Sequence, residues 1–270
     1  MTKLVRKFRS QRGTSFLEVM IALVITGVVT TAILKAYVTQ HKQYLVQEDI
    51  TDIQQNARAG IAELSRHIRM AGYDLPLGLT PIVTANTNPD TITLTYRSSD
   101  CDTYLASAMP QPSAELKCGS DVSCFNDGQW VYIFEPDSGI GEWFEITHVQ
   151  DAAMHIQHNT MVLSRKYGAD ALLLAMTQVK FFIDTSDTDH PNMMLQLAGQ
   201  SPQVYAANIS NLQFQYRMKN GAVVDETAIA GDIREVLISV TGRSREPDPD
   251  EEVNPYRQRT FATSINLRNI

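Results

Sequence analysis

The chain has 270 residues, of which 43% are hydrophobic and 20% charged, values typical of a folded protein with a sizeable core. Its net charge of −7 is unevenly distributed: residues 1–13 hold five basic residues and no acidic one, leaving 30 acidic residues against 18 Lys and Arg in the remainder. The acidic body argues against nucleic acid as a partner, because phosphate binding requires positive charge.

An apolar segment follows this basic leader. From Phe16 to Leu34 the chain runs for 19 residues with Glu18 as its single charge, which is close to the length that crosses a bilayer. Basic residues before such a segment favour retention of the N-terminus in the cytoplasm. We therefore predict a transmembrane segment within residues 14–35 that places these side chains in the lipid bilayer: Phe16, Leu17, Val19, Met20, Ile21, Leu23, Val24, Ile25, Val28, Val29, Ile33 and Leu34.

The helical pattern continues past this segment. No proline interrupts residues 36–71, and apolar side chains recur every three or four residues at Val46, Ile50, Ile53, Ala57, Ile61, Leu64, Ile68 and Ala71. Gly72 is a natural C-terminal cap. The pattern predicts one helix over about residues 14–71, roughly 87 Å long, with an amphipathic half at 36–72. The alternative, an anchor followed by a separate surface helix, needs a break at Gly27 or Gly60.

After Gly72 the pattern changes to period two, which is typical of strands. We predict strands at residues 91–96, 130–134, 143–149, 154–163, 178–184, 212–218, 234–241 and 259–267, with a turn at 135–142 that joins the second and third into a hairpin. Residues 98–127, 185–203 and 243–256 are predicted loops, and 172–176 is too short to assign. The fold class is α+β: a long N-terminal helix packed on a mostly antiparallel sheet, with residues 73–270 as the β-rich domain.

The three cysteines, Cys101, Cys118 and Cys124, all fall in the predicted loop 98–127. If the body is exported, one disulfide with one remaining thiol is expected, and the sequence leaves the pairing open. Free thiols are one alternative. A metal site is another, weakened because CxxC spacing is missing.

Two further groups of residues resemble metal sites without matching them. His155 and His158 lie on a predicted strand, where residues three apart point to opposite faces. The stretch DTSDTDH (184–190) lacks the glycine and glutamate of an EF-hand loop. Motifs for a catalytic nucleophile, a nucleotide or a zinc protease are missing as well. We expect no metal, no cofactor and no enzymatic activity.

The order of basic leader, Gly13, Thr14, Glu18 and continuing amphipathic helix resembles the type IV prepilin signature. In that family a membrane peptidase cleaves after the glycine and methylates the new N-terminus, which implies cleavage between Gly13 and Thr14 and N-methylation of Thr14. This chain departs from the family at Thr14, where Phe is the commonest residue. In an ordinary secretory signal, the alternative, the apolar segment precedes a small-residue cleavage site.

Both ends of the remaining chain resemble the PilW group of minor pilins, at NARAGIAELSRHIRMAGYD (56–74), NISNLQFQYRMKNG (208–221), REVLISVTGRS (234–244) and YRQRTFATSINLRNI (256–270). The resemblance implies a type IV pilin-like fold and a single-pass inner-membrane precursor with a periplasmic body, later incorporated in the pilus. It also implies a place in a priming or tip complex. The implied partners are prepilin peptidase, other minor and major pilins, and the inner-membrane pilus assembly machinery.

Three alternative functions stay open at this point. A J-type pseudopilin of type II secretion shares the leader and the general plan. An adhesive pilus-tip protein needs a ligand surface, for which residues 98–127 are the candidate. A membrane-anchored periplasmic enzyme would keep its leader.

Glu18 has a physical role in a pilin assembly. Cleavage gives Thr14 a new amine, and in a bundle of helices the carboxylate of one subunit can pair with the amine of its neighbour. About 4 Å apart, the two charges attract by about 4 kcal/mol at an effective dielectric of about 20. Much of this offsets desolvation, so the pair is expected to set the register of the subunits. The alternative is an acid that reaches water at the membrane edge.

Overall fold

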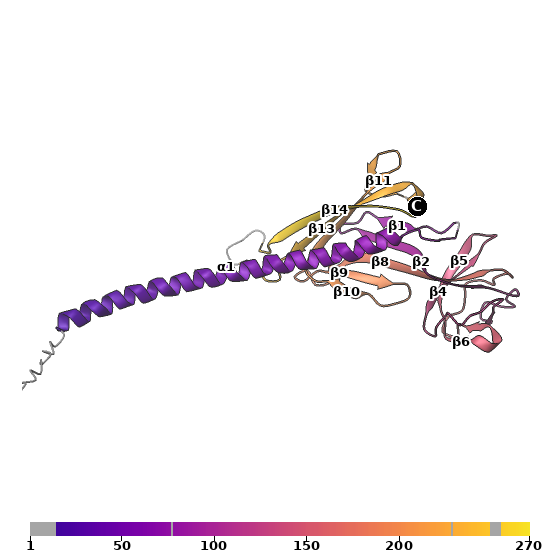
Figure 1. Ribbon diagram of the computed structural model, residues 1–270, viewed down its shortest axis with the longest axis horizontal. Helices are drawn as coiled ribbons and strands as arrows, with labels where there is room; N and C mark the ends of the chain where they lie inside the picture. The colour runs from indigo at the N-terminus through magenta and orange to yellow at the C-terminus, as the bar shows by residue number, and fades with distance from the viewer. Residues whose placement is uncertain (1–14, 77, 228, 249–254) are drawn as a thin grey trace, which may run out of the picture. The chain divides into compact units, whose positions relative to one another are not determined.

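The computed structural model describes residues 15–76, 78–227, 229–248 and 255–270, and the chain divides into two compact units, Met1–Ile50 and Thr51–Ile270. Helix α1 (Phe16–Met70) has 55 residues and is continuous in Figure 1. The single helix predicted from the sequence is therefore confirmed, without a break at Gly27 or Gly60. It ends where Gly72 takes a φ of +82°, a left-handed conformation that favours glycine. The predicted functional boundaries at residues 35 and 72 stay predictions.

The second unit contains three antiparallel sheets among the described residues. The largest has the order β1-β2-β8-β4-β5, and β9 and β10 continue from β8. Its strands are β1 (Ile82–Ala85), β2 (Thr91–Tyr104), β4 (Trp130–Glu135), β5 (Ile140–Glu145), β8 (Leu172–Asp184), β9 (Asn192–Leu197) and β10 (Gln203–Ala206).

The other two sheets are smaller. One has the order β12-β11-β13-β14, formed by β12 (Val223–Val224), β11 (Ile209–Met218), β13 (Ile233–Arg243) and β14 (Gln258–Asn266). The other has the order β3-β7-β6, formed by β3 (Leu116–Lys117), β7 (His155–Gln157) and β6 (His148–Gln150). Short 3-10 helices lie at Asp151–Ala153 and Ala230–Asp232. A long helix with antiparallel sheets confirms the α+β class.

The C-terminal part of α1 forms one core with the two larger sheets. Its buried side chains include Ile53, Ala57, Leu64 and Ile68, each at most 2% exposed, as the apolar stripe predicted. Ala57, Leu64 and Ile68 share this core with side chains of both sheets: Ile92 and Phe181 of the large sheet, and Phe214, Val236 and Ile238 of the β11–β14 sheet. Burial of each large aliphatic side chain is worth about 1.5–3 kcal/mol. This contact fixes residues 51–70 on the β-rich body.

Strand β4 separates two further cores. Val131 and Ile133 belong to one core, around the cysteines, whereas Tyr132 and Phe134 belong to the other. Both faces of this strand are therefore covered. The predicted hairpin is confirmed, since β4 pairs with β5 from Trp130–Glu145 to Glu135–Ile140.

The prediction of a loop over residues 98–127 was wrong at its start, because β2 continues to Tyr104. Pairing with β8 shifts register between Arg97 and Asp102 and then resumes. Strand β3 also falls within this loop. Backbone pairing with β8 holds this polar segment of β2 in the sheet. The amino-acid composition of the segment did not predict that pairing.

Four other boundaries differ from the predictions. The strand predicted at 143–149 is divided, because β5 ends at Glu145. Thr147 N then donates to the carbonyl O of Gln157 at 2.8 Å, and the chain continues into the third sheet. The strand predicted at 154–163 is reduced to β7. Residues 172–176 and 178–184 form one strand, β8. The loop predicted at 185–203 contains β9. Three further strands were not predicted: β1, β10 and β12.

A polar cluster links α1 to β2 inside the main core. The ring of His67 is 4% exposed, with Nδ1 2.8 Å from Tyr96 Oη and Nε2 3.0 Å from Glu63 Oε1. Nε2 also lies 3.0 Å from Arg66 Nη2, so it faces an acceptor and a donor, while Nδ1 contacts the Tyr96 hydroxyl, which can donate or accept. Arg66 forms an ion pair with Glu63. Burial, followed by the nearby charge of Arg66, lowers the pKa of His67, so the ring is neutral.

This burial predicts that the body loses stability as the pH falls below about 6.5. Unfolding returns His67 to its ordinary pKa of about 6.5, so the unfolded chain takes up a proton that the folded chain excludes. Stability is full above this pH and declines below it, down to the lowered pKa of the folded state. We expect a lower free energy of unfolding at about pH 5.5 than at about pH 7.5, measured by chemical denaturation.

The variant His67→Gln is expected to show a weaker pH dependence over this range, because glutamine offers a donor and an acceptor without titrating. The matched control is His41→Gln, since His41 is an exposed histidine of the same helix, and it should keep the wild-type pH dependence. An unchanged slope in His67→Gln would contradict the assignment.

Candidate functional site

The N-terminal part of α1 carries the residues on which the sequence placed function. Here the first hydrogen bonds of the helix run to Ser15, whose carbonyl O accepts from Glu18 N at 2.9 Å and from Val19 N at 3.2 Å. Glu18 lies in the first turn. Free N–H groups give this end of a helix a partial positive charge, which favours a carboxylate there. The side chain therefore stands at the helix terminus, within reach of groups that approach that end.

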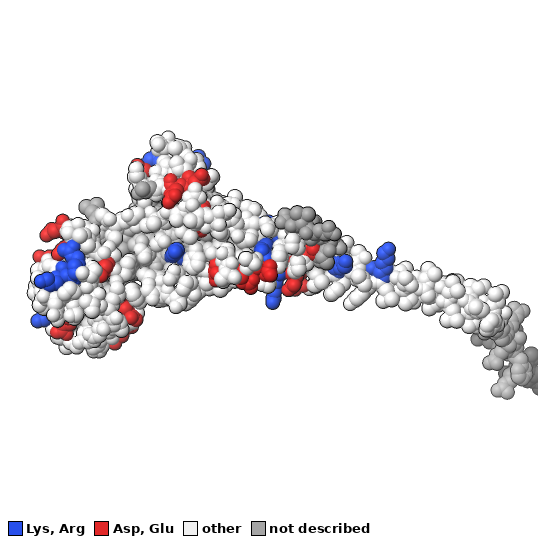
Figure 2. Space-filling model, turned by 180° about the vertical axis from the view of Figure 1, so that it is seen from behind, with Lys and Arg blue, Asp and Glu red and all other residues white. Residues whose placement is uncertain are grey.

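The predicted transmembrane side chains are exposed throughout, from 45% for Val19 to 80% for Phe16. The visible face of the helix is white over this part in Figure 2, without charged side chains. Within the described residues, α1 is the one helix long and apolar enough to span a membrane, and its most apolar window has a mean hydropathy of 2.3 with no residue buried. An exposed apolar surface of this size is typical of a segment that contacts lipid or another protein.

Hydroxyl groups in the apolar segment are satisfied within the helix. Thr26 Oγ1 donates to the carbonyl O of Ala22 at 2.7 Å, and Thr31 Oγ1 donates to the carbonyl O of Gly27 at 2.8 Å. Such bonds to the preceding turn allow threonine to enter an apolar environment at low cost. A bond to the preceding turn cannot compensate the charge of Glu18 in the same way, because an ionised carboxylate in an apolar environment needs a cation or several hydrogen-bond donors.

The predicted processing site, Gly13 and Thr14, lies outside the described residues. Cleavage and N-methylation there stay predictions, as does the pairing of Glu18 with the new amine.

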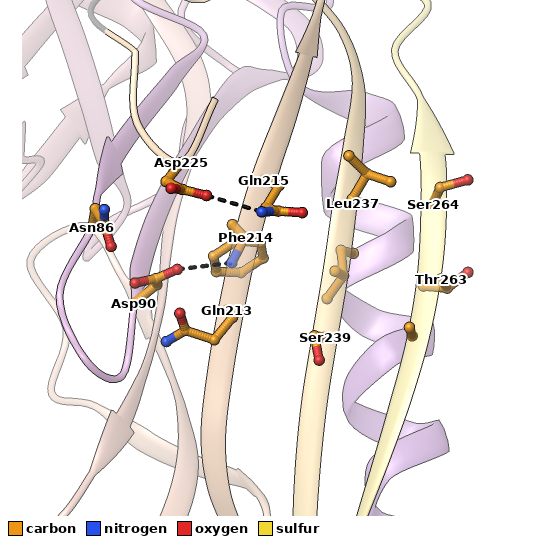
Figure 3. A pocket seen from close by; sticks show the side chains of 12 residues that line it. Asn86, Asp90, Gln213, Phe214, Gln215, Asp225, Leu237, Ser239, Thr263 and Ser264 are labelled. Carbon is orange, nitrogen blue, oxygen red and sulfur yellow. Dashed lines mark hydrogen bonds between the residues drawn. The ribbon is translucent and has the colours of Figure 1, made fainter. Parts of the chain in front are cut away.

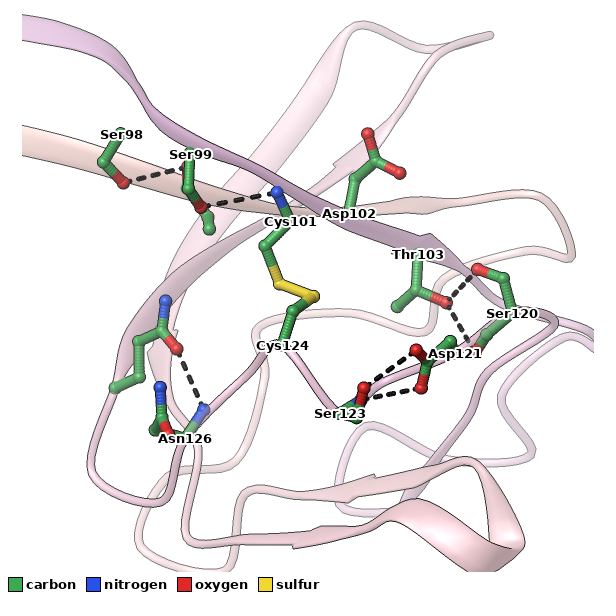
Figure 4. The surroundings of a disulfide bond; sticks show 12 residues. Ser98, Ser99, Cys101, Asp102, Thr103, Ser120, Asp121, Ser123, Cys124 and Asn126 are labelled. Atoms are coloured by element: carbon green, nitrogen blue, oxygen red, sulfur yellow. Dashed lines mark hydrogen bonds between the residues drawn. A yellow bond between two sulfur atoms is a disulfide. The ribbon is translucent and has the colours of Figure 1, made fainter.

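A disulfide joins Cys101 of β2 to Cys124 in the following loop, with their Cα atoms 5.8 Å apart (Figure 4). This answers the pairing that the sequence left open. Cys118 is the remaining thiol, and it is 5% exposed in the core that also contains Cys101. Burial raises the pKa of Cys118 to about 11, so the thiol is protonated and unreactive at neutral pH.

The other polar groups weighed in the sequence each have local partners. Both ring nitrogens of His158 face backbone carbonyl groups, Met161 O at 2.8 Å and Ala114 O at 2.9 Å, whereas His155 faces Glu115 at 3.3 Å. The carboxylates of Asp184 and Asp187 accept hydrogen bonds from backbone N–H groups of their own turn. Among the described residues, His, Cys, Asp and Glu form no cluster of three that could hold a metal ion.

Sequence reasoning missed Asp90, which joins the two larger sheets. Its backbone N donates to the carbonyl O of Leu212 at 2.8 Å, and its Oδ2 accepts from Phe214 N at 2.8 Å (Figure 3). The side chain is 2% exposed, and burial raises its pKa. A groove of about 460 Å³ lies beside it, on the face of β11, β13 and β14 that carries Gln213 and Gln215. The signal in the sequence was the position of Asp90 directly after Asn-Pro. This combination is common in turns of many kinds, so it did not indicate the role of Asp90.

Comparisons of the chain with models of protein families, with curated proteins and with solved structures find no match.

The disulfide predicts a measurable share of the stability of the body. Cys101 and Cys124 are 23 residues apart, and closing a loop of this size is worth about 3 kcal/mol in the chain-entropy model. We expect the double variant Cys101→Ala/Cys124→Ala to lower the free energy of unfolding by about 2–4 kcal/mol, measured by urea denaturation.

The control for the disulfide variant is Cys118→Ala, which removes a buried sulfur but no covalent link. Its expected cost is about 1 kcal/mol, from the lost packing alone. If both variants cost the same, the disulfide contributes nothing beyond packing.

Proposed function

We propose that the chain is a minor pilin of the PilW type, processed by prepilin peptidase and assembled with other pilins through its N-terminal helix. The proposal is supported chiefly by one observation: the exposed apolar half of α1, with Glu18 as its single charge, continues without a break into a half that is buried in a β-rich body. A cleavable secretory signal does not need this continuity, because it is removed before the body folds.

In this proposal the apolar half of the helix has two successive environments. Before assembly the segment Phe16–Leu34 lies in the bilayer, where its 19 residues span roughly 28 Å at 1.5 Å per residue. After assembly the same side chains pack against the helices of neighbouring subunits. Both environments are apolar, so the transfer between them requires no exposure to water.

Glu18 directs the register of this packing. Processing leaves an ammonium group on Thr14, four residues before Glu18 in the chain. A carboxylate in an apolar bundle is stable only with a cation, and the ammonium group of an adjacent subunit supplies one. Subunits whose helices are displaced along the axis leave both charges unpaired. The pair therefore penalises wrong registers more than it stabilises the right one.

The β-rich body is carried by the rest of the helix. Burial of Ile53, Ala57, Leu64 and Ile68 fixes the body on α1, so a helix held in a filament also holds the body. The disulfide joins β2 covalently to the region that follows it, which is a long part of the body with little regular structure. This suits a domain that functions outside the cytoplasm, where disulfides persist.

Processing is the first prediction of this proposal. We expect the protein purified from membranes to begin at Thr14 when prepilin peptidase is present and at Met1 when it is absent, as shown by intact mass and N-terminal sequencing. The same spectrum should show one added methyl group on Thr14. A chain that keeps residues 1–13 in both strains would overturn the proposal in favour of an anchored protein.

The second prediction separates assembly from processing. Glu18→Ala should be cleaved normally, because cleavage depends on Gly13, but its recovery in sheared pili should fall about tenfold or more, equivalent to about 1.4 kcal/mol of lost discrimination. The matched control is Glu48→Ala, an exposed acid of the same helix, which should assemble as the wild type does. Equal recovery of Glu18→Ala and the wild type would refute the role of Glu18.

A further inference from the structure

Both tryptophans of the chain, Trp130 and Trp143, line one pocket of the β-rich body. The pocket has a volume of about 240 Å³ and lies where β4, β5 and β8 meet the turn after β9. Its polar lining includes Gln129, Gln178 and Gln200. None of its eleven lining residues is charged, although 20% of the chain is. The pocket therefore combines aromatic surface with neutral hydrogen-bonding groups.

The two indole rings are held in place by their neighbours. Gly199, with a φ of +67°, lies directly against Trp130, and a Cβ atom at this glycine would overlap the indole ring. Trp143 contacts Tyr132 edge to face, with ring centroids 5.3 Å apart. Both tryptophans are half-buried and line the pocket. Fixed aromatic surfaces bind ligands at a low entropic cost.

The amide groups around the rings retain hydrogen-bonding capacity. Gln129 Oε1 accepts from Asn126 N at 3.0 Å, which leaves the amide NH2 of Gln129 as a donor. Gln178 Nε2 lies 3.5 Å from Thr95 Oγ1, at the limit of a hydrogen bond, and Gln200 is exposed. Amides both donate and accept without charge, which suits hydroxyl groups on a ligand.

We propose that this pocket binds one neutral pyranose unit of a saccharide. A pyranose has an apolar C–H face that packs on an indole ring and equatorial hydroxyl groups that bond to amides at its edge. The small volume favours a single ring, since pockets for drug-sized ligands start at about 300 Å³. The uncharged lining disfavours an acidic or amino sugar, whose charge would lose its hydration without a partner.

The larger groove beside Asp90 does not share this chemistry. Phe214 there is 2% exposed, so it offers no stacking surface, and Asp90 and Asp225 add carboxylates. That groove therefore supplies control positions for the test. The saccharide site stands on the β-rich body alone and does not rest on the proposed role in pilus assembly.

The test uses tryptophan fluorescence, excited selectively over tyrosine, because both tryptophans of the chain line the pocket. The full-length protein, in a zwitterionic detergent without a sugar head group, is titrated with methyl β-glucopyranoside, methyl β-galactopyranoside and N-acetylglucosamine. For a ligand of this size we expect a saturable change with a Kd on the order of a few mM for at least one of them. Glycerol at the same concentrations, a polyol without a ring face, should give no saturable change.

Two variants place the binding in this pocket. Gln200→Ala, at an exposed position, should weaken the affinity about fivefold by removing one neutral hydrogen bond. Gln215→Ala, in the groove beside Asp90, should leave the affinity unchanged, and circular dichroism should show both variants folded. The proposal is overturned if none of the three saccharides gives saturation, if glycerol gives the same response, or if Gln200→Ala binds as tightly as the wild type.

Discussion

One helix has to be stable in two environments, and the rest of the structure depends on this. The apolar half of α1 exposes its side chains, while the part from Ile53 onward buries one face in a core that it shares with the two larger sheets. Only a helix satisfies every backbone hydrogen bond within its own segment, so it alone can pass from an apolar medium into a protein core without unpaired groups. The threonines that bond to their own preceding turn extend this independence to side chains.

The body packs against one face of the C-terminal part of this helix, from Ile53 to Ile68, and leaves its other faces exposed. Packing there is mostly apolar, with one polar exception, the cluster of His67, Tyr96, Glu63 and Arg66. Such a cluster fixes the orientation of the helix on the strand more than it adds to the free energy of folding, because hydrogen bonds are directional. Asp90 plays a comparable part between the two larger sheets.

The disulfide region and the tryptophan pocket belong to the far end of the large sheet, where β2, β8, β4 and β5 carry two separate cores. The core around Tyr132 and Phe134 is the smaller one, and edge-to-face packing of Tyr132 on Trp143 makes it more rigid, while the disulfide restrains the region around the other core. The same rigidity suits a binding surface. The two proposals place assembly and recognition in different parts of the chain, the first in α1 and the second at this end of the body.

Features that depend on local periodicity could be predicted from the amino-acid sequence. The length of α1, its end at Gly72, its buried stripe from Ile53 to Ala71 and the hairpin of β4 and β5 follow from spacings of three, four and two residues. Tertiary structure alone decided which cysteines pair, that β2 continues through a polar run, and that both tryptophans and three glutamines share one pocket. These features join residues far apart in the chain, and such contacts depend on strand pairing and burial, which leave no periodic signal in the sequence.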